Sequence, residues 1–172
     1  MSLFAAAWTL ASIKQLAEGG AASVTYYETT GWRGIKETDG GCPAPELFCS
    51  RPGLVFPVYH VFADIADLKT AELIACTSNE PLRIQGLALR AGGSLHLLLT
   101  NLTAEAQTCA VGPLHGDRVA VRTLDANTAP QAMAQPDEFR SHRDWVPTAS
   151  STLTLDLAPY SVTRIDLGRE GS

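Results

Sequence analysis

The hydrophobic and polar positions of this chain follow two different patterns, which change near residue 70. Before that point, apolar side chains recur at helical spacing over residues 4–18 and again over residues 54–68. Between these two helices, residues 22–28 read Ala-Ser-Val-Thr-Tyr-Tyr-Glu, a β-branched and aromatic run that is typical of a buried strand. A helix, a buried strand and a second helix in this order predict a piece of a βα barrel or of a doubly wound sheet.

From residue 72 to residue 167 the pattern changes to short runs of alternating apolar and polar residues, separated by turn sequences such as Ala-Gly-Gly. These runs predict strands at residues 72–78, 83–90, 95–101, 108–111, 118–124, 152–157 and 161–167. About seven short strands at this spacing are typical of an antiparallel β-sandwich. The sequence therefore predicts a mainly β chain with two parts. An αβα segment occupies residues 4–69, and an antiparallel β-sandwich occupies residues 72–167.

One long segment, residues 125–151, interrupts the alternation and contains three prolines. Loops of this length are usually functional or mobile. One interpretation is a flap that contacts carbohydrate, with Trp145 as an aromatic platform. The interpretation that we favour is a crossover in which Phe139 and Trp145 cover the edge of the sandwich.

The charge of the chain argues against two classes of partner. Its formal net charge is -5 and it has no basic cluster, so neither nucleic acid nor an anionic membrane is expected to bind. No apolar run approaches the length of about 20 residues that a membrane helix needs. The apolar N-terminus has no preceding Lys or Arg, so we expect an internal helix and a cytoplasmic protein. Residues 1–3 and 170–172 look like cloning remnants around a piece of a longer protein.

The cysteines leave two interpretations open. Cys42 and Cys49 share a loop rich in Gly and Pro, where we favour reduced thiols over a disulfide between them. A zinc site that also used His60 would lack a fourth ligand, so no metal and no cofactor is predicted. His60 is expected to pack or cap within its helix. Cys76 is expected to be a small core residue.

The candidate site lies at the end of the predicted strand. Glu28 ends this strand, and Trp32 and Arg33 follow in a loop flanked by glycines. In both fold classes considered above, functional side chains lie where the C-terminal end of a strand meets the next loop. Strand alternation places Tyr26 and Glu28 on one face. The alternative is that Glu28 is a solvated carboxylate paired with Arg33 or Lys36.

Two stretches resemble known families. Residues 157–163, Leu-Ala-Pro-Tyr-Ser-Val-Thr, resemble the closing strand of many glycoside hydrolases of the large retaining (β/α)8 clan. Residues 24–32, Val-Thr-Tyr-Tyr-Glu-Thr-Thr-Gly-Trp, resemble the end of the barrel in the D-apionate lactonase family, glycosidase-like proteins that hydrolyse a sugar-acid lactone. The resemblance implies that residues 4–69 are the end of a (β/α)8 barrel and that residues 24–32 contain its eighth strand.

The same resemblance implies roles for the strand-end residues. In the glycosidase clan the acid/base and the nucleophile follow the fourth and seventh barrel strands, which would lie upstream of this chain. Glu28 would then be an auxiliary acid/base or hydrogen-bonding group. Glu28 would also belong to the wall of the site, Tyr26 would bind the substrate, and Trp32 would stack on a sugar ring. Arg33 would reach a carboxylate or hydroxyl, because its planar guanidinium suits a bidentate partner.

These observations support three expected functions. The first is the C-terminal part of a glycoside hydrolase-like, carbohydrate-active hydrolase. The first alternative is part of a sugar-acid lactone hydrolase, and the second is a non-catalytic carbohydrate-binding or structural β-domain. We expect the complete protein to be an enzyme that binds a sugar or sugar acid, and this chain alone to be inactive. We also expect the chain to self-associate, because a barrel segment on its own leaves strand edges and apolar helix faces open.

Overall fold

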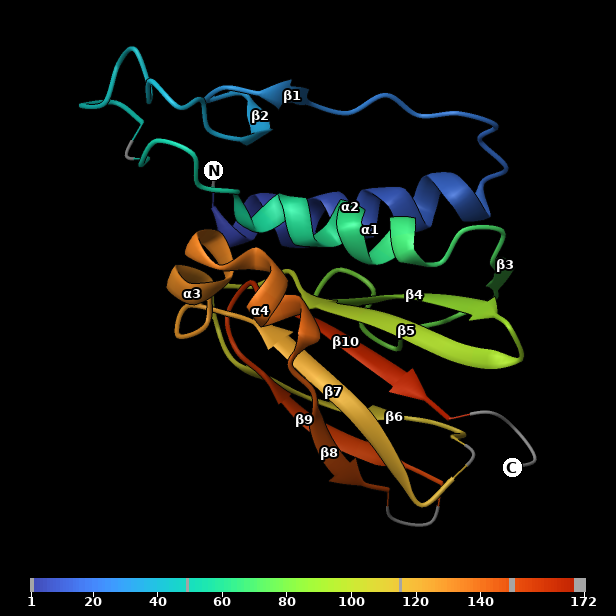
Figure 1. Ribbon diagram of the computed structural model, residues 1–172. Helices are drawn as coiled ribbons and strands as arrows, with labels where there is room; N and C mark the ends of the chain where they lie inside the picture. Colours follow the sequence, from blue (N-terminus) through green and yellow to red (C-terminus); the bar gives the residue numbers. More distant parts are fainter. Residues whose placement is uncertain (1, 49, 115, 149–150, 169–172) are drawn as a thin grey trace.

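An antiparallel sheet of six strands forms the centre of the molecule, as the computed structural model in Figure 1 shows for residues 2–48, 50–114, 116–148 and 151–168. The strands lie in the order β3-β4-β5-β10-β7-β8. Their bounds are Glu72–Ile74 for β3, Ile84–Ala91 for β4, Ser94–Asn101 for β5, Arg118–Leu124 for β7, Asp144–Pro147 for β8 and Val162–Leu167 for β10. Long helices lie across one face of this sheet, and a small second sheet lies across the other (Figure 1).

The small sheet pairs β6 (Gln107–Val111) with β9 (Leu153–Leu157) and completes the sandwich. The core between the two sheets is apolar, because alternate residues of the large sheet point toward β6 and β9. Its buried members are Ala88, Leu97, Leu99, Leu114, Val119, Val121, Leu153, Ile165 and Leu167. The predicted mainly β fold with an antiparallel β-sandwich is confirmed.

Helices α1 (Leu3–Glu18) and α2 (Pro57–Asp67) cover the opposite face of the large sheet. Leu10 of α1 and Val61 of α2 are fully buried in the core that they share with this face. The backbone N–H of Ala5 donates to the Ser2 hydroxyl at 3.3 Å, so Ser2 caps α1. Ser2 and Leu3 are thus the N-cap and the first residue of α1. Met1 and residues 169–172 lie outside the described residues.

No helix in the described part of the chain is long and apolar enough to span a membrane.

The predicted buried strand over residues 22–28 is wrong. Residues 22–27 have no regular structure, and only β1 (Glu28–Thr30) forms, in a short parallel pair with β2 (Gly34–Lys36). A buried parallel strand requires hydrogen-bonded neighbours and cover on both faces. The described chain supplies β2 alone as a neighbour, and Val24 is consequently 44% exposed.

Side chains hold residues 22–27 where the backbone ladder is missing. The hydroxyl of Tyr26 lies 2.7 Å from the Ser12 hydroxyl of α1, and the hydroxyl of Tyr27 lies 2.9 Å from that of Thr9. Successive tyrosines therefore bond to the same helix. The strand alternation predicted for this segment is therefore absent at the two tyrosines, because residues outside a ladder do not follow strand periodicity.

The predicted loop over residues 125–151 contains regular structure. It forms α3 (Ala129–Ala134), α4 (Pro136–Ser141) and strand β8, with prolines in the first turns of both helices, where their missing N–H is tolerated. Phe139 is buried, as the favoured interpretation predicted. Trp145 is 61% exposed on β8, so the part of that interpretation that assigned it a covering role is wrong.

His60 joins α2 to α3. Its Nε2–H donates to the carbonyl of Ala132 at 3.0 Å, and its ring meets Phe139 edge-on with 4.9 Å between centroids. The Nδ1 atom is buried without a partner in the described residues. Burial therefore lowers the pKa of His60 from 6.5 to about 4, because protonation would leave a buried imidazolium. The predicted packing role of His60 is confirmed.

The depressed pKa of His60 predicts a pH-dependent free energy of unfolding. Between pH 6.5 and pH 4 the unfolded chain binds the proton and the folded chain does not, so stability falls as the pH is lowered through this window. The loss is at most about 3 kcal/mol. His60→Gln keeps an N–H for Ala132 and does not titrate, so urea denaturation should show a smaller pH dependence for this variant. His142→Gln, at a side chain that is 65% exposed, is the control. Equal pH dependence in wild type and His60→Gln would contradict the assignment.

Candidate functional site

Glu28 and Tyr26 come together at a small open pocket beside β1. The pocket has a volume of about 200 Å³ and is lined by Val24, Tyr26, Tyr27, Glu28, Thr29, Ile35 and Phe62. Glu28 is exposed, and its carboxylate makes neither an ion pair nor a hydrogen bond within the described residues. The alternative pairing with Arg33 or Lys36 is therefore not formed. The carboxylate is available to a ligand.

Trp32 and Arg33 do not line this pocket. The Trp32 ring stacks on Phe48 with 4.3 Å between centroids, and the Arg33 guanidinium lies 4.5 Å from the centroid of the Trp32 ring. A sugar ring that stacked on Trp32 would compete with these contacts. The structure thus brings together two of the four predicted site residues and leaves the other two on the adjoining loop.

Glu37 is a strand-end carboxylate that was not among the residues predicted for the site. It follows β2 directly and is fully buried. The Ser50 hydroxyl donates to one carboxylate oxygen at 2.6 Å, and the backbone N–H of Thr38 donates to the other at 2.8 Å. The Ser50 bond, supported by Thr38, holds the pKa of Glu37 below its usual value despite burial. The position of Glu37 after Gly-Ile-Lys was the available signal, since the same strand-end rule had identified Glu28.

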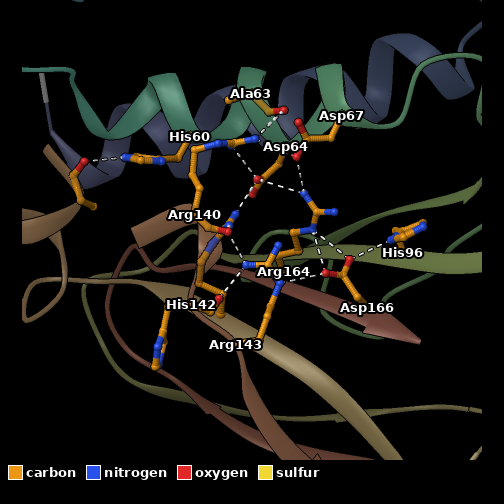
Figure 2. A network of polar contacts seen from close by, with 12 residues as sticks. His60, Ala63, Asp64, Asp67, His96, Arg140, His142, Arg143, Arg164 and Asp166 are labelled. Atoms are coloured by element: carbon orange, nitrogen blue, oxygen red, sulfur yellow. Dashed lines mark hydrogen bonds and ion pairs between the residues drawn. The ribbon is translucent and has the colours of Figure 1, made fainter. Parts of the chain in front are cut away.

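The largest polar network of the described residues lies elsewhere, between α2 and the sandwich (Figure 2). Asp64 of α2 is buried, and its Oδ1 accepts hydrogen bonds from Arg122 of β7, Arg140 of α4 and Arg164 of β10. Asp67, one turn further along α2, accepts from Arg140 at 2.7 Å and from Arg164 at 3.1 Å. The network therefore connects α2 to three separate elements, β7, α4 and β10.

Asp166 of β10 extends the network across the sheet. Its carboxylate accepts from Arg164 at 2.8 Å, from Nδ1 of His96 at 2.7 Å and from Arg143 at 3.2 Å. Burial alone would raise the pKa of Asp166, but the bonds from His96 and Arg164 outweigh it, so this pKa lies below its usual value. All three carboxylates of the network are thus occupied by protein donors. The network is structural.

The cysteines and possible metal ligands form no recognisable centre in the described residues. Cys42, Cys76 and Cys109 are free thiols, whereas Cys49 lies outside the described part of the chain. No three His, Cys, Asp or Glu side chains within that part are placed to hold a metal ion.

Comparison with solved structures defines the class of fold. The chain superimposes on the glycoside hydrolase family 30 subfamily 8 xylanase from Clostridium acetobutylicum with a TM-score of 0.67 and 12% identity, over 96% of this chain and 39% of the xylanase. An arabinose-bound family 51 α-L-arabinofuranosidase gives 0.54 and 13%, over 77% and 21%. The family 30 xylanase C of Talaromyces cellulolyticus gives 0.52 and 14%, over 79% and 27%. The chain thus has the fold of part of a (β/α)8-barrel glycoside hydrolase and spans well under half of these proteins.

Sequence profiles identify the family. The D-apionate lactonase TIM barrel domain matches residues 1–70, and the D-apionate lactonase C-terminal immunoglobulin-like domain matches residues 81–165. The chain belongs to the D-apionate lactonase family, as its resemblance had indicated. No curated protein sequence matches it.

The network around Asp64 predicts unequal effects for its two helix carboxylates. Asp64→Asn leaves three arginines facing a neutral amide in a buried site, so we expect the free energy of unfolding to fall by about 3–5 kcal/mol. Asp67→Asn removes the charge of a side chain that is 47% exposed, so the free energy of unfolding should fall by less than about 1 kcal/mol. Urea denaturation of both variants measures the difference. Equal losses would show that Asp64 does not hold the network together.

Proposed function

We propose that this chain is the C-terminal part of a carbohydrate-active hydrolase, and that the complete protein hydrolyses the lactone of a sugar acid. The observation that supports this proposal is the match of both parts of the chain to the D-apionate lactonase family. The likeness to xylanases and arabinofuranosidases, at 12–14% identity, supports the barrel-and-sandwich fold and carries no substrate with it.

Glu28 has an auxiliary role in this proposal. Lactone hydrolysis requires an activated water at the carbonyl carbon and hydrogen-bond donors for the oxyanion that forms. The unpaired carboxylate of Glu28 can accept a proton from water or from a sugar hydroxyl. The pocket around it is otherwise built from Tyr, Val, Thr, Ile and Phe, with no cationic side chain among its lining residues. In this proposal the rest of the complete protein supplies the activated water and the oxyanion donors, so the isolated chain is expected to be inactive.

Tyr26, Trp32 and Arg33 contact the substrate around Glu28. The ring of Tyr26 forms part of the pocket wall, and its hydroxyl is held by Ser12. Trp32 and Arg33 lie on the loop that follows β1, where they meet the part of the substrate that extends beyond the pocket. Arg33 is exposed and supplies the bidentate donor that a sugar-acid carboxylate accepts.

We place the protein in the cytoplasm. The free thiols of Cys42, Cys76 and Cys109 support a reducing compartment.

Activity assays of the isolated chain test whether part of the site lies outside these residues. The 172-residue chain should hydrolyse neither aldonolactones nor aryl glycosides above the buffer rate, whereas the complete protein should hydrolyse aldonolactones. If the complete protein hydrolysed aryl glycosides and not lactones, it would be a glycosidase, and the proposal would be wrong. Turnover by the chain alone that disappears in Glu28→Gln would show that the site is complete here.

Substitution of Glu28 in the complete protein tests its role. Glu28→Gln keeps the size of the side chain and removes its charge, so kcat/KM should fall by about 10- to 100-fold, equivalent to one charge-assisted hydrogen bond. Glu72→Gln is the matched control, because Glu72 is also an exposed carboxylate on a short strand but lies outside the pocket. If Glu28→Gln had wild-type kinetics, Glu28 would be a solvated carboxylate with no role in the site.

The isolated chain is also proposed to self-associate, through α1. Phe4, Trp8 and Leu16 of this helix are 50%, 52% and 39% exposed, and exposed apolar side chains on one element favour association. Sedimentation over a concentration series should therefore show a dimer or larger species, and Trp8→Glu should shift it toward monomer. Trp145→Glu, at an exposed tryptophan on a different element, should leave the mass unchanged. A monomeric wild type at every concentration would contradict this.

A further inference from the structure

Another pocket lies beside the sandwich, where α3 and α4 meet β7 and the start of β8. Its volume is about 610 Å³, and it shares no lining residue with the pocket of Glu28. Phe139 is the one apolar residue of its lining, and the others carry charged or polar side chains. Pockets that bind small molecules usually have volumes of about 300–1,000 Å³. The size and the polar lining therefore fit a small polar ligand.

The bottom and the mouth of this pocket differ in burial and in charge. Arg122 of β7 and Phe139 of α4 are 3% and 5% exposed, so they lie at the bottom. Arg143 is 25% exposed, whereas Glu138 and Asp144 are exposed and lie at the mouth. The pocket is therefore cationic at its bottom. Its carboxylates lie in water, where solvent and salt weaken the effect of their charge.

The arginines of the pocket belong to the network of Figure 2, in which cationic side chains outnumber carboxylates. Four arginines donate to only three carboxylates. The arginines are Arg122, Arg140, Arg143 and Arg164, and the carboxylates are those of Asp64, Asp67 and Asp166. Burial lowers the pKa of Arg122, Asp64 opposes this shift, and the charges of Arg143 and Arg164 add to it. A negative charge placed beside Arg122 and Arg143 would therefore be stabilised.

Both arginines of the pocket have donors that the described residues do not use. Arg122 donates through Nη1 to a backbone carbonyl and through Nη2 to Asp64. Arg143 donates through Nε to Asp166 and through Nη1 to two backbone carbonyls. Nε of Arg122 and Nη2 of Arg143 have no partner in the described part of the chain, and neither is among the side-chain atoms buried there without one. A ligand can therefore reach both, and guanidinium donors suit a carboxylate.

The mouth of the pocket suits hydroxyl groups. The side chains of Gln131 and Glu138 are exposed and make no hydrogen bond within the described residues. Gln131 offers both a donor and an acceptor, and the carboxylates of Glu138 and Asp144 offer acceptors to a hydroxyl. The same two carboxylates repel a negative charge. A ligand that carries both kinds of group would therefore direct its carboxylate toward the bottom and its hydroxyls toward the mouth.

We propose that this pocket binds a small polyhydroxylated carboxylate. The carboxylate of the ligand accepts hydrogen bonds from Arg122 and Arg143, and its hydroxyl groups bond to Gln131, Glu138 and Asp144. A simple anion would use the arginines and leave the mouth without a partner. A neutral sugar would leave the positive charge at the bottom without compensation. The site is separate from the pocket of Glu28 and does not depend on the proposed function.

Isothermal titration calorimetry of the 172-residue chain tests the ligand class with three probes. Gluconate carries a carboxylate and hydroxyls, sorbitol carries hydroxyls alone, and acetate carries a carboxylate alone. Gluconate should bind about tenfold or more tightly than either of the others, because it alone uses both ends of the pocket. Equal affinity for acetate would show a simple anion site, and equal affinity for sorbitol a neutral sugar site. Either result, or no binding of gluconate, would overturn the proposal.

Two substitutions locate the binding in this pocket. Arg143→Gln removes one guanidinium, so the affinity for gluconate should fall about tenfold or more, whereas Arg118→Gln, at an exposed arginine outside the pocket, should not change it. Gln131→Glu adds a negative charge at an exposed side chain and should weaken binding about fivefold without affecting the fold. Gln15→Glu, on the exposed part of α1, is its control.

Thermal unfolding of each variant shows whether the fold is kept, since Arg143 also bonds to Asp166. Unchanged affinity for gluconate in both Arg143→Gln and Gln131→Glu would overturn the proposal. Loss of binding in Glu28→Gln, with Gln131→Glu unaffected, would overturn it too, because gluconate would then occupy the pocket of Glu28.

Discussion

The buried carboxylate of Asp64 determines how the two parts of this chain fit together. A buried carboxylate is costly unless cationic donors compensate its charge, and here Arg122, Arg140 and Arg164 all donate to Oδ1 of Asp64. These arginines come from a strand, a helix and another strand, so their convergence fixes α2 relative to each of them. The apolar contacts of α1 and α2 with the large sheet add energy but are less directional. The ionic network thus sets the orientation in which the apolar faces pack.

The orientation of α2 also affects the candidate site. α2 carries Phe62, which lines the pocket of Glu28 and contacts the rings of Tyr26 and Tyr27. The sandwich therefore acts on the pocket through α2, although none of its residues lines it. Under the proposed function, the sandwich would support one wall of the candidate site through α2.

Sequence reasoning predicted the sandwich well because its strands make local, alternating patterns that fold against each other. β7 has the predicted bounds, and the others differ by a few residues. The strand predicted at residues 22–28 does not form. Its β-branched and aromatic residues are typical of a buried strand, but the described chain does not bury them. It also missed α3 and α4, since helices of six residues are too short to show a periodic pattern. Of the predicted site residues, Glu28 and Tyr26 line the same pocket, although the strand alternation from which Tyr26 was predicted does not form. The burial of Glu37 depends on Ser50, thirteen residues away, and could not be predicted.

The two tyrosine hydroxyls bound to α1 have a consequence for assembly of the site. Tyr26 and Tyr27 hold residues 22–27 through side chains, and residues 22–26 make no backbone hydrogen bond with other residues in the described part of the chain. Each such side-chain bond contributes only about 1 kcal/mol net, so adjoining strands that offered a full ladder would outcompete both. Residues 22–27 are therefore ordered, but a change of their conformation would cost little free energy. Glu28, at its end, would then gain a rigid position only when neighbouring strands are present, which couples completion of the barrel to the ordering of the pocket beside Glu28.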